Sequence, residues 1–267
     1  MTAAFADLPS RALVRVAGLD WRVFLQGLIS NDVEMLEPGA IRFAGLLNPQ
    51  GRLLFDLFVI GGEEGCRLDV QAARRDDLVQ RLLIYRLRAK IEIAPEPGRI
   101  SALWNAAATP EGWSPDPRLA ELGFRGVDQP PPDGARRLDE AAYDAHRLQV
   151  GAPDPARDAL PDKTYPIEAD FDLLNGIDFK KGCFVGQETT SRMKRRGGVR
   201  SRMLPIVFEG EAPPFGAEVM AGTLRAGEVL SGGDGRAIAL LRLDRIEGAE
   251  LTVQGRPVTA LKPGWMA

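Results

Sequence analysis

The sequence predicts an α+β fold that ends in a small antiparallel barrel or sandwich. Two observations support this class. In the first hundred residues, strand-like and helix-like segments form a meander of strand, hairpin, strand, helix and strand, which differs from the regular alternation of a doubly wound sheet. Beyond Gly198, short β-like runs are separated by glycines at roughly ten-residue intervals, which is typical of small all-β units.

The predicted elements of the first half follow from apolar periodicity and turn residues. Asp20 is the expected N-cap of a helix in which Trp21, Phe24, Leu25 and Leu28 form one apolar face. The turn cluster Asn-Pro-Gln-Gly separates the two arms of a hairpin. In order, we expect a strand at 11–18, a helix at 19–30, a hairpin at 41–62, a strand at 66–72, a helix at 74–87 and a strand at 90–97.

The second half changes in composition. Residues 106–132 are rich in proline, glycine and alanine, so we expect loops and a domain edge there. Residues 138–151 return to a helical pattern, and 151–171 are mostly irregular. A further helix is expected after Gly186, ending at Gly197.

Composition limits the classes of function. The 267 residues are 45% hydrophobic and 27% charged, as in ordinary globular proteins. A net charge of −3 argues against a general nucleic-acid binder. One histidine, His146, excludes a histidine-rich zinc site, and we expect no metal site. Two distant cysteines form no disulfide framework, and no secretory signal or membrane-length apolar run is visible. We therefore expect a cytoplasmic protein without a membrane span.

Cys183 lies in the segment "IDFKKGCFVGQETTSRMKRRGGVR". Gly182 and Gly186 bracket it, and glycine allows tight turns and close approach of a ligand. Lys180, Lys181 and the start of the next helix would favour the thiolate form. Two interpretations stay open at this point: a reactive exposed thiol, or a small residue packed in a glycine turn.

The run "RMKRRGGVRSR", residues 192–202, holds six cations in eleven residues. It is either a solvated helix end or an anion site for phosphate, carboxylate or RNA. Few aromatic residues interrupt it, so a base-stacking platform is not indicated.

The run "KGCFVGQETTSR" resembles the K-G-C-[FY]-x-G-Q-E-x-x-x-R signature of YgfZ-type folate-binding proteins. These are relatives of the glycine-cleavage T-protein, an aminomethyltransferase, and they include a mitochondrial factor that helps mature iron–sulfur proteins. Further stretches fit in the same order, among them "LNPQGRLLFDLFV" and "PIEADFDLLNGIDFKKGC". The matching signature residues are Lys181, Gly182, Cys183, Gly186, Gln187, Glu188 and Arg192.

The resemblance implies three domains in a ring around a central folate channel. It places a discontinuous folate-binding domain at 1–45 plus 136–197, an inserted α+β domain at 46–135 and a β-barrel domain at 198–267. Tetrahydrofolate, or another reduced folate, is the implied cofactor.

The resemblance also implies folate-binding residues. Asp56 would lie in the hairpin that faces folate, with Gln149 and Glu168 toward the pterin. Lys181 and Arg192 are candidates for binding the folate glutamate tail or for positioning the signature loop. T-proteins carry a paired Asp-Asp where this chain has Phe55-Asp56, and a glutamate where it has Gln149. Both departures weaken an aminomethyltransferase function.

These observations predict a tetrahydrofolate-binding accessory protein that supports assembly or repair of iron–sulfur enzymes, with Cys183 as the functional thiol. Its expected partners are folate and iron–sulfur client or assembly proteins. One alternative is a folate-dependent aminomethyltransferase that relies on Asp56 alone. The other is an RNA-binding or tRNA-modification helper that uses residues 192–202.

Overall fold

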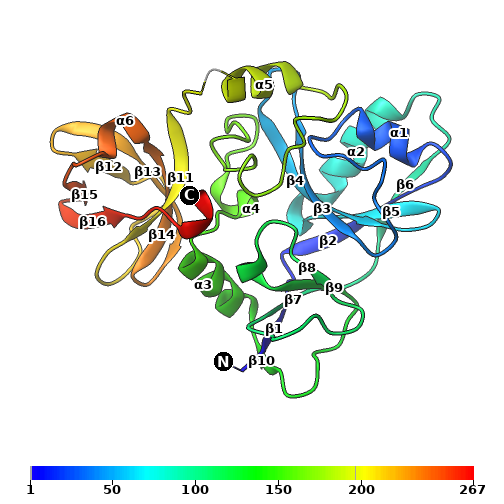
Figure 1. Cartoon of the computed structure of the whole chain (residues 1–267), viewed down its shortest axis with the longest axis horizontal. Helices are drawn as coiled ribbons and strands as arrows, with labels where there is room; N and C mark the ends of the chain where they lie inside the picture. The colour runs from blue at the N-terminus through cyan, green and yellow to red at the C-terminus, as the bar shows by residue number, and fades with distance from the viewer. Residues whose placement is uncertain (1, 196) are drawn as a thin grey trace.

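The computed structural model describes residues 2–195 and 197–267, which form two five-stranded sheets and one closed barrel (Figure 1). The predicted α+β class is confirmed, and the C-terminal unit is a barrel. None of the helices in the described ranges is both long and apolar enough to span a bilayer.

The first sheet is antiparallel and contains the predicted hairpin. Its strands β3 and β4 are joined by the predicted turn, where Gly51 adopts a φ of +82°. In spatial order the strands are β3 (Ile41–Leu47), β4 (Leu53–Gly61), β5 (Gly65–Gln71), β2 (Arg11–Ala17) and β6 (Glu92–Glu96).

Two helices accompany this sheet, and apolar side chains cover both of its faces. Helix α1 (Trp21–Gln26) and helix α2 (Arg75–Arg86) pack on one face, with the short helix η1 (Ala72–Arg74) leading into α2. Asp20 precedes α1 as expected, but its carboxylate accepts from the backbone N–H of Lys90 instead of capping the helix. Residues of the 167–184 segment and of the barrel pack on the opposite face.

The second sheet combines the N-terminus with residues 100–138. Its order is β10 (Arg136–Leu138), β1 (Ala4–Asp7), β7 (Ile100–Trp104), β9 (Phe124–Val127) and β8 (Ser114–Pro115). The prediction of loops alone at 106–132 is wrong, because β8, β9 and η2 (Ala120–Leu122) lie there. Pairing of β9 with β7 stabilises this strand, and local composition carries no sign of that non-local pairing.

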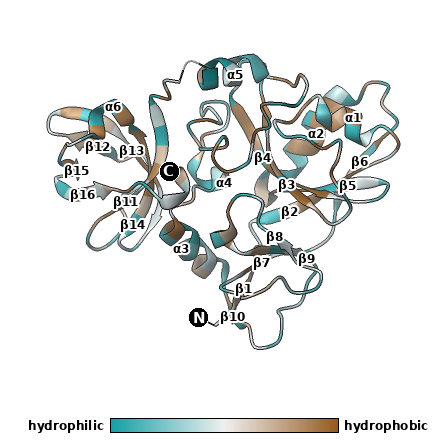
Figure 2. Ribbon diagram, viewed as in Figure 1, coloured by the Kyte–Doolittle hydropathy of each residue, from teal (hydrophilic) through white to brown (hydrophobic). Residues whose placement is uncertain are grey.

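Helix α3 (Glu140–Val150) connects the second sheet to the rest of the chain and matches its predicted range. Asp139 caps its start, and Gly151 ends it with a φ of +77°. The short helix α4 (Pro155–Asp158), a long irregular segment and helix α5 (Gln187–Arg195) follow. In Figure 1, α5 lies between the barrel and the first sheet, and Figure 2 shows mostly hydrophilic colour along it.

The barrel closes through six antiparallel strands around an apolar interior. Helix α6 (Leu243–Ile246) follows β14, and η3 (Gly264–Met266) lies near the C-terminus. The strands, in the order in which they pair, are β11 (Ser201–Val207), β14 (Arg236–Arg242), β13 (Leu224–Gly233), β12 (Glu218–Ala221), β15 (Leu251–Val253) and β16 (Arg256–Ala260).

The barrel lies inside the range expected for the third domain. The domain boundary expected between residues 45 and 46 falls within β3, and the residues on both sides of this boundary pair with β4. The division of residues 1–197 into two domains therefore stays a proposal.

Candidate functional site

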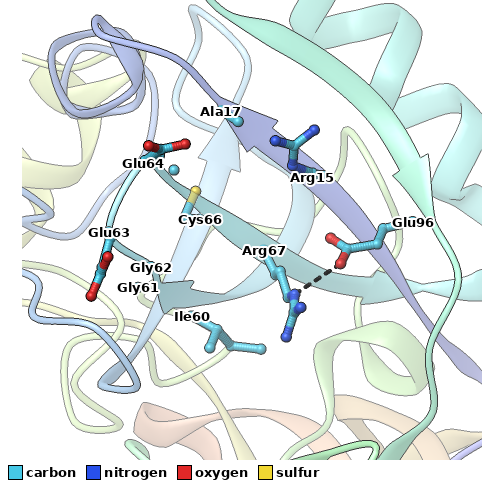
Figure 3. A pocket seen from close by; sticks show the side chains of 11 residues that line it. Arg15, Ala17, Ile60, Gly61, Gly62, Glu63, Glu64, Cys66, Arg67 and Glu96 are labelled. Atoms are coloured by element: carbon cyan, nitrogen blue, oxygen red, sulfur yellow. Dashed lines mark hydrogen bonds and ion pairs between the residues drawn. The ribbon is translucent and has the colours of Figure 1, made fainter.

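Cys183 is exposed in the loop that precedes α5, as the sequence predicts. Cys66 is buried on β5, in the lining of a pocket whose rim includes the ion pair of Arg67 with Glu96 (Figure 3). Burial raises the pKa of the Cys66 thiol, which makes its thiolate scarce. Cys183 is therefore the thiol that another molecule can reach.

Lys181 anchors the Cys183 loop from inside the protein. Its Nζ donates to the backbone carbonyls of Ile29 and Asn31, both at 2.7 Å. Desolvation lowers the pKa of Lys181 to about 8. The ammonium is thus turned inward, and the expectation that it flanks an exposed thiol is wrong. Lys180 remains exposed beside it.

The other end of the loop is fixed against the first sheet. The N–H of Val185 donates to the carbonyl of Gly27 at 3.1 Å, and the Oε1 of Gln187 accepts from the N–H of Phe184 at 3.3 Å. Gly186 has a φ of +80°, and a Cβ there would lie 2.5 Å from the carbonyl oxygen of Asn48. A side chain at this position would therefore clash with the hairpin turn.

Gly182 has no such constraint. A Cβ on this residue would meet nothing within 4 Å, and its φ is not positive. Of the two glycines that bracket Cys183, only Gly186 is required by the backbone.

Helix α5 directs its charged residues to solvent. Glu188 and Arg192 form a loose, exposed ion pair at 3.8 Å. Lys194 pairs with Asp172 at 3.5 Å, and Arg202 binds both Asp170 and Asp172. Several cations of the 192–202 run are therefore already paired within the protein, which reduces the charge available to a nucleic acid. Residue 196 of this run lies outside the described residues.

Asp56 belongs to a cluster of buried charges between the two sheets. Arg11 donates from Nη1 to Asp56 at 2.8 Å and from Nε to Asp69 at 2.6 Å. Arg125 donates to the second oxygen of Asp69 at 2.6 Å. The last two members are Arg118 and Asp116, and Arg118 donates to the Asp116 carboxylate from two nitrogens. We call Arg11, Asp56, Asp69, Asp116, Arg118 and Arg125 the central ion-pair cluster.

The three guanidinium groups of this cluster surround one aromatic ring. Their Cζ atoms lie 3.6 to 5.4 Å from the ring centroid of Phe58, close enough for cation–π attraction. Three cations face three anions, so the cluster is neutral overall.

Of these residues, only Asp56 was predicted from the sequence as a site residue. The sequence did carry one sign of the cluster: Arg11 and Asp69 are charged residues at core-facing positions of otherwise apolar strands.

The three residues predicted to bind folate are not brought together by their contacts. Asp56 is tied to Arg11, whereas Glu168 accepts from the N–H of Tyr165 at 3.0 Å. Burial raises the pKa of Glu168. Gln149 is exposed near the end of α3. Asp56 retains one oxygen, Oδ1, for which no protein donor is found among the described residues.

The chemistry open to the Cys183 loop is that of a single exposed thiol. Within the described ranges, no group of three or more histidine, cysteine, aspartate or glutamate side chains is placed to hold a metal ion. Protein-bound iron–sulfur clusters usually need four protein ligands. The loop can therefore contribute one ligand, and any others would come from elsewhere.

Comparisons with known proteins agree with this fold. Residues 200–267 match the family described as CAF17, C-terminal beta-barrel domain. The chain is 31% identical over 277 residues to the human iron–sulfur cluster assembly factor IBA57, mitochondrial, covering 90% of this chain and 78% of the human protein. It is 35% identical over 240 residues to the IBA57 homolog of Mycosarcoma maydis, covering 78% of this chain but only 59% of that protein.

The fold has a solved counterpart. The glycine cleavage system aminomethyltransferase T from Bartonella henselae superposes with a TM-score of 0.79 at 19% identity, covering 99% of this chain and 86% of that one. This likeness shows the predicted T-protein-like fold. The expected cytoplasmic location is contradicted, because the IBA57 relatives are mitochondrial by name.

Proposed function

Because the chain belongs to the IBA57 family of iron–sulfur cluster assembly factors, we propose that it supports cluster assembly in client proteins through its Cys183 loop. The YgfZ-like signature and the exposed thiol support this assignment. The chain spans less than two thirds of the first fungal relatives, so the role concerns the part that is shared.

One observation carries the proposal: a loop anchored on both sides presents a single exposed cysteine. Lys181 holds the loop on one side of Cys183, and Gly186 and Gln187 hold it on the other. A thiolate in a fixed position can bind iron with little loss of conformational entropy. Because one thiolate does not fill the coordination of a cluster, a partner protein supplies the other ligands.

Chemical reconstitution tests this ligand count. The purified protein is incubated anaerobically with ferrous iron and sulfide, desalted, and assayed for bound iron and for visible absorbance. We expect no stoichiometric cluster on the protein alone. A stable cluster that survives desalting and the change Cys183→Ala would contradict the proposed role of the loop.

Tetrahydrofolate is a second ligand in this proposal, favoured by the free Oδ1 of Asp56. Arg11 would keep the carboxylate ionised and oriented while Oδ1 accepts a hydrogen bond from the ligand. Transfer of an aminomethyl group is not proposed, because the position of the second hairpin carboxylate is taken by Phe55, which is buried against the guanidinium of Arg74.

Calorimetry with tetrahydrofolate tests the second ligand. Asp56→Asn is the informative change, because Asp56→Ala would leave the buried Arg11 without this partner. We expect saturable binding to the unmodified protein, weakened in the variant by about 1–3 kcal/mol. No heat with either protein would remove folate from the proposal, and equal affinities for both would remove the role of Asp56. Either result leaves the Cys183 function standing.

A further inference from the structure

A groove opens between the edges of the two sheets, close to the Cys183 loop. Its volume is about 710 Å³, within the range of binding sites for small ligands or short peptides. Strand β3, at the end of the first sheet, forms one wall, and β8, at the end of the second sheet, forms the other. We call this the edge groove, lined by Ile41, Phe43, Ser114, Pro117, Ile177 and Lys180.

In β3, the backbone N–H and C=O groups of every second residue point toward the edge groove. Gly45 exchanges hydrogen bonds with Ser30, on the side away from β4. Since the direction of backbone groups alternates along an antiparallel strand, Phe43 and Ile41 face the same side as Gly45. The carbonyl of Ala40 bonds to Gly61 in β4, which agrees with this alternation.

At both ends of this edge, a side chain donates a hydrogen bond to a backbone carbonyl that a neighbouring strand would otherwise pair with. The Nδ2 of Asn31 donates to the carbonyl of Phe43 at 2.7 Å, and the Oγ of Ser114 donates to the carbonyl of Gly39 at 2.8 Å. Between them, no partner is found among the described residues for the backbone N–H and C=O of Ile41 that face the groove. An unpaired edge of this kind is a template for an added strand.

The groove has an apolar floor and a cationic rim. Ile41, Phe43 and Ile177 are buried, and they form part of one core cluster. Arg42 and Lys180 are exposed on the rim, and neither forms an ion pair with a described residue. Asp178 also lines the groove, and its Oδ1 accepts from the N–H groups of Lys180 and Lys181 at 2.6 and 3.2 Å, so two cations and one anion leave the rim with a net positive charge. An acidic ligand with apolar side chains would match this surface.

The groove and the Cys183 loop share one support. Asn31 bonds to β3 through its side chain and to Lys181 through its carbonyl. A segment bound beside Ile41 would therefore lie against the same short piece of chain that anchors Cys183.

We propose that the edge groove binds an extended acidic segment of a partner protein, which pairs with Ile41 as an added strand. The acidic side chains contact Arg42 and Lys180, and alternate apolar side chains face Ile41 and Ile177. The groove thereby brings the partner to Cys183. That the partner is an iron–sulfur protein rests on the proposed function. That the bound segment is extended, acidic and partly apolar rests on the groove alone.

Peptide binding tests the groove independently of iron–sulfur chemistry. The probe is a short fluorescein-labelled peptide in which Glu alternates with Val and Leu, titrated at low ionic strength by anisotropy. We expect saturable binding with a Kd below ~1 mM. Binding should slow hydrogen exchange of the Ile41 and Phe43 amides. The same peptide N-methylated at alternate backbone nitrogens cannot complete the strand pairing and should fail to bind.

Matched variants separate the groove from general charge attraction. Arg42→Glu with Lys180→Glu should weaken binding by about tenfold or more. Arg88→Glu with Lys262→Glu makes the same change of net charge at exposed sites outside the groove, and should have little effect. Binding that survives N-methylation, or falls equally in both double variants, would overturn the proposal. Cys183→Ala should bind the peptide as the unmodified protein does. The peptide test therefore remains valid even if Cys183 proves to have no part in cluster assembly.

Discussion

The two lysines before Cys183 have opposite environments. Lys180 is exposed, whereas the ammonium of Lys181 is buried and donates to two backbone carbonyls. Sequence alone treats them as equivalent neighbours of the thiol. The structure makes Lys181 a positioning residue and leaves Lys180 free for contact with a ligand.

Replacing Lys181 should therefore loosen the loop. Lys181→Met leaves the carbonyls of Ile29 and Asn31 without their donor, at a cost of about 1–3 kcal/mol in the free energy of unfolding. Hydrogen exchange across 181–187 should accelerate, and the rate of Cys183 alkylation by iodoacetamide should change. Lys180→Met is the control and should leave exchange unaltered. Equal behaviour of the two variants would show that the buried contacts do not hold the loop.

Asp170 gives a prediction for pH dependence. It binds Arg202 through one oxygen at 2.7 Å, while no residue in the described part of the chain bonds to its buried Oδ2. Desolvation raises its pKa to about 8. The folded state therefore holds this proton more tightly than the unfolded state does, and the contribution of Asp170 to stability falls as pH rises from about 4 toward 8. Asp170→Asn should flatten this slope in thermal melts, and an unchanged slope would contradict the assignment.

At the scale of elements, the contact between the hairpin turn and the start of α5 fixes the site. Gly186→Ala should place a Cβ against the carbonyl of Asn48 at a φ of +80°. We expect a loss of about 1–3 kcal/mol in unfolding free energy by denaturant titration. Gly182→Ala, whose Cβ meets nothing within 4 Å, should be nearly neutral. If Gly182→Ala proved the more damaging change, the described loop geometry would be wrong.

Most individual elements could be predicted from local pattern. The turn at Asn48–Gly51, the helix capped by Asp139 and the strand at Cys66 carry their signals within a few residues. Strand β9 could not be predicted in this way, because pairing with β7 stabilises it and its own composition does not.

At the scale of the molecule, the central ion-pair cluster ties the two sheets together. Asp69 on β5 binds Arg11 on β2 and Arg125 on β9 at once. Asp69→Ala would leave two buried guanidinium groups short of a partner, and we expect a loss of about 3–5 kcal/mol in unfolding free energy. Arg15→Ala, at the exposed pair with Glu92, should cost at most about 1 kcal/mol. Similar losses in both variants would contradict a structural role for the cluster.

This cluster and the edge groove were beyond sequence reasoning for one physical reason. Their members are far apart in the chain and meet only after both sheets have formed, as Asn31, Ile41, Ser114 and Lys180 do in the groove. Cys183 could be singled out because its local segment resembles a known signature. The inward direction of Lys181 needed the tertiary structure.

Complementation tests the central claim most directly. Cells depleted of their own IBA57-family protein receive the unmodified chain, Cys183→Ala or Cys66→Ala, and the activity of iron–sulfur enzymes is measured at equal protein levels. We predict rescue by the unmodified chain and by Cys66→Ala, in which the changed thiol is buried, and loss of rescue by Cys183→Ala with an unchanged Tm. Full rescue by Cys183→Ala would contradict the account, because the exposed thiol would then have no part in the function.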